Sequence, residues 1–466
     1  MTSDLADLSA VELLDAYRRG VASPVEATRA CLARIERLNG TFGAFTRVDG
    51  EAALAAARAS EARWRAARPS GAIDGVPVTV KDLILVAGWP TRRGSLSTAG
   101  EPPAAADAPA VARLRAAGAV LLGKTTTPEF GWKGVTDNPC GEVARNPWDP
   151  AATAGGSSGG AAVAATLGMG ALHLGSDGGG SIRIPAGFSG IVGLKPTFGR
   201  VPAWPASPFG TLAHLGPMTR TVADAALMLT VMAGPHPRDW LALPDAGADY
   251  GCDLESGLRG LRIAYSPTLG HARVEAEVRA AVDRAVQRLG ELGAAIEEVD
   301  PGFASPLRLF ERLWYPGAAL VVAGIAPSRR AALDPGLRRV AALGNRMRAR
   351  DLQAALKERA ELAIHMELFF ERFDLLATPT LPLTAFAALR DAPGADAGGD
   401  WVEWTPFSYP FNLTQQPAIS APCGRSTAGL PIGLQLVARK YADALVLRAA
   451  RAAETFHPFT APPVVG

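Results

Sequence analysis

Apolar, β-branched segments alternate with helical segments in the first half of this chain, and this alternation limits the folds it can adopt. A β-branched run covers residues 76–80, a helical pattern follows at residues 107–117, and a second apolar strand is expected at residues 119–122. Alternation of this kind favours a sheet that carries helices. The pattern therefore predicts an α/β fold.

The remaining elements follow from periodicity and from helix-start signals. Two capping boxes, Ser9-x-x-Glu12 and Ser23-Pro24-x-Glu26, predict that the chain opens with helices. Further helices are expected at residues 51–67, 158–167, 221–233, 272–291, 304–313, 314–325, 335–372 and 442–456. Further strands are expected at residues 171–175, 191–194, 260–265, 294–299, 374–378, 417–422 and 431–437. No segment has the composition of a linker, so we expect one large domain over residues 1–466.

Two glycine-rich segments that carry serines lie on connections beside expected strands. Ser157 lies in Gly155-Gly156-Ser157-Ser158-Gly159-Gly160, and Ser181 ends the run Asp177-Gly178-Gly179-Gly180-Ser181. Glycine supplies little apolar burial, but it lets main-chain N–H groups crowd around a small anion. Catalytic groups are commonly held on such connections. The two segments therefore indicate a catalytic region that binds an oxyanion.

A lysine lies upstream at the end of an expected strand, in Val78-Thr79-Val80-Lys81-Asp82. An isolated lysine at this position would be explained by an ion pair with Asp82 at the surface. Lysine is rare in this chain, however, and the two serine segments supply groups that a base could activate. We therefore interpret Lys81 as a candidate general base.

Composition excludes several classes of function. The formal net charge of +2 gives no field that would indicate a nucleic-acid partner. The four cysteines have no Cys-x-x-Cys spacing, so they indicate reduced thiols and no metal knuckle. No segment is long and apolar enough to span a bilayer, and no secretory signal is visible at the N-terminus. We expect a cytoplasmic enzyme that acts on a small molecule.

Two other catalytic motifs match formally but lack their structural context. Residues 118–125 match a phosphate-binding loop, but that loop must follow a strand, and residues 120–122 are themselves the expected strand. Gly155-x-Ser157-x-Gly159 matches the nucleophile elbow of α/β-hydrolases, which would make Ser157 the nucleophile. The strand that should precede the elbow is missing, because residues 146–150 are turn-like. Both interpretations are therefore disfavoured.

Residues 71–220 resemble the amidase signature family, and weaker similarity continues to the C-terminus. The matching segments are Gly75-Val76-Pro77-Val78-Thr79-Val80-Lys81-Asp82, Gly123-Lys124-Thr125, Glu129-Phe130, Gly155-Gly156-Ser157-Ser158-Gly159-Gly160, Gly180-Ser181-Ile182-Arg183-Ile184-Pro185, Gly193-Leu194-Lys195-Pro196-Thr197, Pro417-Ala418-Ile419-Ser420 and Gly433-Leu434-Gln435. The resemblance implies an α/β fold with a large central mixed β-sheet covered by helices on both faces. Residues 1–70 would be N-terminal helices, residues 71–220 the catalytic core, and residues 221–466 the remaining sheet, helices and substrate-pocket region.

By position, the resemblance implies that Ser181 is the nucleophile, Ser157 a bridging serine on a cis peptide, and Lys81 the general base. A buried neutral lysine can have a pKa of about 7 to 8 and can take a proton from a serine hydroxyl. Ser181 would form an acyl-enzyme that water hydrolyses, with no metal and no organic cofactor. The supporting groups would be the main-chain N–H groups of Gly178, Gly179, Gly180 and Ser181 around the oxyanion, Ser158 beside the relay, and Asp177 and Arg183 bracing the loop.

The resemblance implies a stand-alone amidase that hydrolyses a carbon–nitrogen bond of a small apolar or aromatic substrate. Esters and carbamates also have carbonyls that the same serine could attack. We expect Trp132, Trp204 and Phe209 to line the pocket. Position 178 is glycine where many members carry threonine, a departure that bears on substrate choice.

The alternative is the A subunit of a glutamine-dependent tRNA amidotransferase. Residues 129–134, however, lack the methionine- and asparagine-rich sequence that such subunits carry. A non-catalytic binding protein is disfavoured because all three catalytic positions are filled. The partners that we expect are therefore a small-molecule amide substrate, with no nucleic acid and no membrane. A homodimer and a monomer both fit this expectation.

Overall fold

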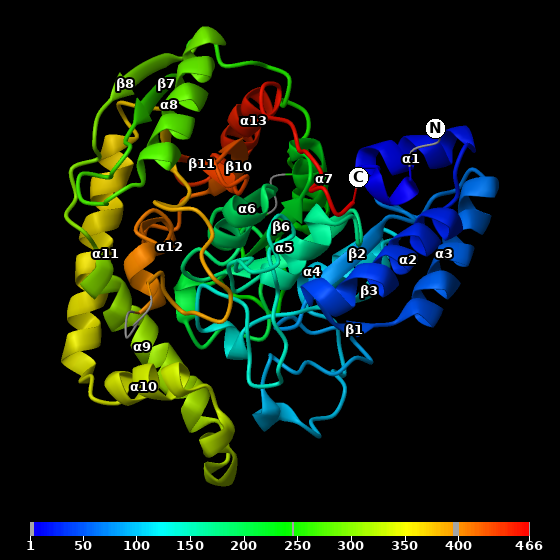
Figure 1. Cartoon of the computed structure of the whole chain (residues 1–466), viewed down its shortest axis with the longest axis horizontal. Coiled ribbons are helices and arrows are strands. Elements are labelled where there is room, and N and C mark those ends of the chain that lie inside the picture. The colour runs from blue at the N-terminus through cyan, green and yellow to red at the C-terminus, as the bar shows by residue number, and fades with distance from the viewer. Residues whose placement is uncertain (1–3, 245–246, 395–399, 466) are drawn as a thin grey trace.

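The computed structural model describes residues 4–244, 247–394 and 400–465. Within these residues, eleven strands form a sheet with the order β1-β3-β2-β4-β6-β5-β10-β11-β9-β7-β8 (Figure 1). The strands are β1 (Phe45–Val48), β2 (Pro77–Lys81), β3 (Val120–Thr125), β4 (Leu172–Asp177), β5 (Val192–Lys195), β6 (His214–Thr219), β7 (Arg262–Tyr265), β8 (Ala295–Glu298), β9 (Leu375–Pro379), β10 (Ala418–Arg425) and β11 (Pro431–Ala438).

The sheet mixes parallel and antiparallel pairs. Strand β2 lies parallel to both β3 and β4, and β7 lies parallel to both β8 and β9. The pairs between them, from β4 and β6 across to β11 and β9, are antiparallel. The α/β fold with a large mixed sheet is therefore confirmed.

Helices cover the sheet on both faces. The helices of the described residues are α1 (Ala10–Arg19), α2 (Pro24–Phe42), α3 (Gly50–Arg65), α4 (Pro109–Ala116), α5 (Gly159–Thr166), α6 (Arg183–Ser189), α7 (Val222–Met232), α8 (Ala276–Glu291), α9 (Leu307–Ala323), α10 (Pro335–Gly344), α11 (Ala349–Phe369), α12 (Pro410–Leu413) and α13 (Asp443–Glu454), of which α9, α10 and α11 pack mainly on one another. Ser9 and Ser23 both form the predicted capping boxes, at the starts of α1 and α2. The sequence therefore locates these two helix starts correctly.

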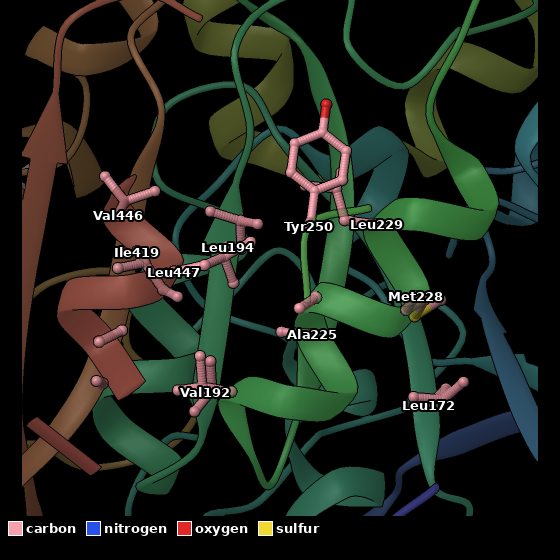
Figure 2. Packing of buried hydrophobic residues seen from close by; sticks show 14 of the residues in the cluster. Leu172, Val192, Leu194, Ala225, Met228, Leu229, Tyr250, Ile419, Val446 and Leu447 are labelled. Atoms are coloured by element: carbon pink, nitrogen blue, oxygen red, sulfur yellow. The ribbon is translucent and has the colours of Figure 1, made fainter. Parts of the chain in front are cut away.

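The largest hydrophobic cluster lies on one face of the sheet, beneath α4, α7, α8 and α13. Figure 2 shows Leu172, Val192 and Leu194 of the sheet facing Ala225 and Leu229 of α7. The other face carries smaller clusters, and α5 and α6 pack there against Met218 of β6. Because alternate residues of a strand point to opposite faces, the helices on both faces pack against side chains of the same strands.

Helix α5 consists of small residues that are all buried. A Cβ added to Gly160 would lie only 2.4 Å from the backbone nitrogen of Thr126, so glycine is needed for this approach. The small residues therefore bring the start of α5, and the serines before it, close to the ends of β2 and β3.

The strands and α-helices differ from the sequence prediction in four respects. Helices α6 and α12 were not predicted, because they span only seven and four residues. Strands β1 and β6 were not predicted, because each is short or interrupted by glycine and proline. Helix α9 runs through Pro316, where the sequence predicted two separate helices. The single helix predicted at residues 335–372 is two helices, α10 and α11. The second of these starts anew because the carboxylate of Asp351 accepts a hydrogen bond from the backbone nitrogen of Arg348.

Across the described ranges, no helix has both the length and the apolar character needed to cross a membrane.

Candidate active site

Lys81 ends strand β2, and its side chain is fully buried. Its Nζ donates hydrogen bonds to Ser157 Oγ at 2.7 Å, Ser158 Oγ at 2.9 Å and Ser176 Oγ at 3.0 Å. Three hydroxyls therefore surround the amine, and they come from the turn before α5 and from β4. The structure brings Lys81 and Ser157 together as the sequence predicted.

Burial lowers the pKa of Lys81 well below 10.5, and the charge of Asp177 opposes this effect only in part. No carboxylate lies within ion-pair distance of Lys81 in the part of the chain that the structure describes. Removal from water disfavours the ammonium form, because a buried charge needs a charged partner. The amine can therefore lose its proton more easily than an exposed lysine and can serve as a base.

Ser157 lies in a tight turn that begins with a cis peptide bond between Gly156 and Ser157, as the resemblance implied. A Cβ added to Gly156 would lie 2.5 Å from the carbonyl oxygen of Val135, so only glycine fits there. The backbone nitrogen of Ser158 donates to the carbonyl oxygen of Ser181 at 3.0 Å. This bond ties the two serine segments to each other.

Ser181 lies between strand β4 and helix α6, at the end of the glycine run. Ser157 and Ser181 both line one cavity of about 190 Å³. Within the described residues, no direct hydrogen bond joins their two hydroxyls. The structure therefore places both hydroxyls at the same cavity, and a proton path between them needs a rotation of one hydroxyl or the approach of a substrate.

The glycine amides before Ser181 divide into two kinds. The backbone nitrogen of Gly180 donates to Asp177 Oδ1 at 2.7 Å, so it does not face an oxyanion. This corrects the sequence prediction, which included Gly180 among the oxyanion donors. Among the described residues, no protein acceptor takes the N–H of Gly178, Gly179 or Ser181. These three amides remain available for an anion.

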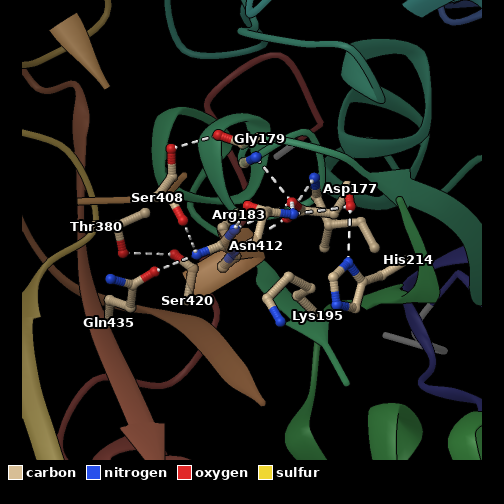
Figure 3. A network of polar contacts seen from close by, with 12 residues as sticks. Asp177, Gly179, Arg183, Lys195, His214, Thr380, Ser408, Asn412, Ser420 and Gln435 are labelled. Atoms are coloured by element: carbon tan, nitrogen blue, oxygen red, sulfur yellow. Dashed lines mark hydrogen bonds and ion pairs between the residues drawn. The ribbon is translucent and has the colours of Figure 1, made fainter. Parts of the chain in front are cut away.

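Asp177 holds the glycine turn in place. Its carboxylate accepts bonds from Gly180 and Ile182 amides and a two-point bond from Arg183, with both distances to the guanidinium at 3.0 Å (Figure 3). Burial raises the pKa of this carboxyl, but the charge and hydrogen bonds of Arg183 outweigh burial and hold the pKa below its ordinary value. The predicted bracing pair is therefore present, and the carboxylate stays ionised.

Arg183 links this turn to the end of the chain. Its guanidinium donates to the carbonyl of Ser408 at 2.9 Å, to Gln435 Oε1 at 2.9 Å and to Asn412 Oδ1 at 2.7 Å (Figure 3). Asn412 also donates to Asp177 Oδ1 at 2.8 Å. Sequence reasoning missed Ser408 and Asn412, because neither stands in a motif and their partners lie more than 220 residues away.

Sequence reasoning also missed Ser176, the third hydroxyl around Lys81. Ser176 immediately precedes Asp177, and its carbonyl oxygen accepts a hydrogen bond from Ser158 Oγ at 3.0 Å. The sequence feature that could have identified Ser176 is the alternation of side chains along β4, which points Ser176 away from the neighbouring Asp177. A polar residue inside a buried strand could have been singled out on that ground.

The cavity wall is mostly aromatic and apolar. Trp204 and Phe209 line it as predicted, and so do Phe130 and Trp314, which the sequence did not single out. The rings of Phe209 and Trp314 stack at a centroid distance of 3.8 Å and an angle of 14°. A Cβ added to Gly178 would lie 2.9 Å from Cζ3 of Trp314. The indole therefore occupies the space that a side chain at position 178 would need.

Trp132 does not line this cavity, which corrects the sequence prediction. Its side chain is 1% exposed and belongs to the hydrophobic cluster beneath α9 and α10. A Cβ added to Gly336 of α10 would lie 2.4 Å from its six-membered ring. The large apolar ring packs against α10, where a buried tryptophan contributes more to packing than most residues.

In the described ranges, no group of three or more His, Cys, Asp or Glu side chains is arranged to hold a metal ion. The polar groups that line the cavity are hydroxyls, main-chain amides, the imidazole of His214 and the guanidinium of Arg93, and the buried Lys81 amine is hydrogen-bonded to Ser157. Such groups suit acyl transfer, in which a hydroxyl attacks a carbonyl and amides stabilise the oxyanion.

A buried amine, two hydroxyls at one cavity and free amides beside a mixed sheet are groups typical of hydrolases. The Amidase family model matches residues 26–447. The chain belongs to the Amidase family. It is an amidase, a hydrolase of carbon–nitrogen bonds.

Relatives of known activity cover almost the whole chain. An acylamidase from Rhodococcus erythropolis is 38% identical over 459 residues, which are 97% of this chain and 96% of that protein. The A subunit of glutamyl-tRNA(Gln) amidotransferase from Chloroflexus aurantiacus is 37% identical over 474 residues, with 96% of each chain covered. The sequence is thus similar both to an acylamidase and to one subunit of an amidotransferase.

Comparison with solved structures also finds amide hydrolases. A bacterial aryl acylamidase of the amidase signature family matches with a TM-score of 0.90 and 30% identity, covering 97% of this chain and 96% of that one. A 6-aminohexanoate cyclic dimer hydrolase with bound substrate matches with a TM-score of 0.90 and 29% identity, covering 99% and 100%. The resemblance stated from the motifs is therefore confirmed.

Proposed function

We propose that this amidase acts alone on the amide of a small apolar or aromatic substrate, with Ser181 as nucleophile, Ser157 as proton relay and Lys81 as base. The observation that carries the proposal is the buried Lys81 amine, which lies 2.7 Å from Ser157 Oγ, and Ser157 lines the same cavity as Ser181. A serine hydroxyl becomes a good nucleophile only when a base takes its proton.

In the first step, neutral Lys81 takes the proton of Ser157, which takes the proton of Ser181 as its oxygen attacks the carbonyl carbon. The carbonyl oxygen then carries the negative charge. Ser157 returns a proton to the leaving nitrogen, the carbon–nitrogen bond breaks, and the acyl group stays on Ser181. Lys81 then returns its proton to Ser157. Water enters and attacks the acyl carbon as the relay takes its proton, and the relay returns a proton to the Ser181 oxygen as the bond between that oxygen and the acyl carbon breaks and the acid leaves.

The amides of Gly178, Gly179 and Ser181 face the position of the oxyanion in this proposal. Each well-placed donor of this kind stabilises the transition state by about 3 to 4 kcal/mol. Asp177 and Arg183 fix the turn, so the amides need not reorganise during the reaction. Ser158 and Ser176 hold the Lys81 amine in the direction of Ser157.

The aromatic wall supports an apolar or aromatic substrate. Phe130, Trp204, Phe209 and Trp314 surround the hydroxyls, and offset or stacked rings favour a flat group between them. The similarity to an acylamidase and to an aryl acylamidase supports the same substrate class. Esters and carbamates remain further candidate substrates, because their carbonyls fit the same chemistry.

The test is labelling by a fluorophosphonate probe together with hydrolysis of a p-nitroanilide. We expect wild type to be labelled and to release p-nitroaniline, and Ser181→Ala to do neither. Ser157→Ala and Lys81→Ala should lower kcat/KM by a factor of about 10² to 10⁴, the usual contribution of general acid–base catalysis. Ser256→Ala, at an exposed serine, is the matched control and should behave as wild type.

Labelling of Ser181→Ala, or full activity of Lys81→Ala, would contradict the proposed roles. Each variant should first be shown to unfold at the same denaturant concentration as wild type, because a misfolded variant is also inactive.

The second candidate is the A subunit of an amidotransferase, which the similarity to that component of glutamyl-tRNA(Gln) amidotransferase favours. Such a protein would release ammonia from glutamine for a partner protein. Glutamine turnover that depends on added partner proteins, without anilide hydrolysis, would select this candidate. We favour the stand-alone enzyme, and a cytoplasmic location agrees with the four unpaired cysteines.

A further inference from the structure

Arg93 is the one permanently charged side chain among the described residues that line the cavity. No aspartate or glutamate is among these lining residues. His214 also lines the cavity, but burial lowers its pKa well below 6.5, so it is neutral. A substrate inside the cavity therefore meets one positive charge and no negative one.

The backbone of Arg93 is fixed to the elements beside the relay serine. Its nitrogen donates to Asp82 Oδ2 at 3.0 Å, and its carbonyl oxygen accepts a bond from the Phe130 nitrogen at 2.8 Å. The residue after Phe130, Gly131, lies against Ser157, because a Cβ added there would be 3.3 Å from Ser157 Oγ. The backbone of Arg93 thus lies on the Ser157 side of the cavity, which the residue lines.

The guanidinium of Arg93 is only partly used by the protein. Its Nη1 donates to Glu101 Oε2 at 2.9 Å and weakly to the carbonyl of Thr91 at 3.4 Å. Within the described chain, its Nε and Nη2 have no protein acceptor. The Glu101 side chain is 48% exposed, and exposed ion pairs are weak, so an incoming anion can compete with it.

We propose that Arg93 is a specificity-determining residue that binds a carboxylate on the amine portion of the substrate. This proposal rests on the proposed function, in which Ser157 returns the proton to the leaving nitrogen. A group beside Ser157 therefore belongs to the amine that leaves. Arginine suits this role because its planar fork matches a carboxylate at two points.

The substrate class is then an amide whose apolar part faces Trp314 and Phe209, and whose amine part carries a planar anion. N-acyl aminobenzoates and N-acyl amino acids have this chemistry. Amides of amines with a second, cationic group are excluded, because Arg93 repels them and no lining carboxylate attracts them.

The experiment compares kcat/KM for N-acetyl-4-aminobenzoate with kcat/KM for N-acetyl-4-toluidine, its neutral counterpart. We expect wild type to prefer the carboxylate, and Arg93→Gln to lower the ratio of the two values about tenfold or more. Arg92→Gln is the matched control, since Arg92 is exposed and does not line the cavity, and it should keep the wild-type ratio. Glu101→Gln should raise the ratio, because it frees the guanidinium.

An unchanged ratio in Arg93→Gln would overturn the proposal, as would an equal loss of preference in Arg92→Gln. The third probe is the toluidide of succinic acid, which carries its carboxylate on the acyl part. A greater effect of Arg93→Gln on this probe than on the aminobenzoate would overturn the placement on the amine side. The proposed function is tested separately, because it requires only that the neutral toluidide is hydrolysed and that Ser181→Ala abolishes this.

Discussion

At the scale of single residues, the surroundings of Lys81 set the pH at which the proposed base can act. Burial lowers its pKa below 10.5, and the reaction requires the neutral amine. Activity should therefore fall as the pH falls through the lowered pKa, and it should be fully developed well below pH 10.5. A profile of kcat/KM against pH, with a p-nitroanilide as substrate, measures this fall in activity.

Two results would contradict this prediction. One is a fall in kcat/KM on acidification that is centred at the ordinary pKa of lysine. The other is a Lys81→Ala variant that retains the same fall in kcat/KM on acidification, which would assign this pH dependence to another group. The residual activity of that variant should instead vary little with pH across the range in which wild-type activity falls.

Gly178 gives a second residue-scale prediction, because it lies 2.9 Å, measured from a built Cβ, from the Trp314 ring. Gly178→Ala should lower kcat/KM about 10- to 100-fold, since overpacking here displaces the amides beside Ser181. Combining it with Trp314→Phe should recover part of the loss, and a double-mutant cycle measures that coupling. Gly40→Ala, at a glycine with open space around it, is the control.

Equal losses in Gly178→Ala with and without Trp314→Phe would show that the ring is not the cause. The sequence alone singled out Lys81, Ser157 and Ser181, because each stands in a motif of glycine or strand residues, and the structure brings the three segments together. It did not identify Trp314, and it misplaced Trp132, because an isolated tryptophan carries no local sign of which cavity or core its ring enters.

At the scale of elements, the turn between β4 and α6 depends on one buried ion pair. Asp177→Asn leaves the guanidinium of Arg183 buried without its charged partner. We expect a loss of about 3 to 5 kcal/mol in the free energy of unfolding, and activity should fall as the amides lose their support. Denaturant unfolding followed by circular dichroism measures the loss.

Glu361→Gln is the control, because its pair with Lys357 is exposed and should change stability by less than about 1 kcal/mol. A similar small change in Asp177→Asn would show that the turn is held by the other contacts.

The elements themselves could largely be predicted, because most strands and helices carry clear periodicity. The failures have physical causes. Gly344 lets α10 approach α9, since a Cβ there would lie 2.1 Å from the carbonyl oxygen of Tyr315. That close contact fixes where α10 ends, and nothing in the helical pattern of residues 335–372 signals it.

At the scale of the whole molecule, the buried histidines make stability depend on pH. Burial lowers the pKa of His173 to about 3, whereas the unfolded chain titrates near 6.5. Between these values the unfolded state binds more protons, so stability rises with pH and falls on acidification, by about 1.4 kcal/mol per pH unit for one histidine. Asp224, whose pKa burial raises to about 6, opposes this between about pH 4 and 6.

Denaturant midpoints measured from about pH 4 to pH 7 test this prediction. His173→Gln should flatten the dependence, whatever its effect at neutral pH, because the variant has no group to protonate there. An unchanged slope would assign the acid sensitivity to other groups, such as His214.

The links between Arg183 and residues Ser408, Asn412 and Gln435 have a consequence for how the enzyme comes into being. A ribosome delivers Lys81, Ser157 and Ser181 long before it delivers the segment that braces the turn. Strand β10 must also enter the middle of the sheet, between β5 and β11. The growing polypeptide therefore cannot complete the brace around the Ser181 turn before residues 408–435 have been synthesised.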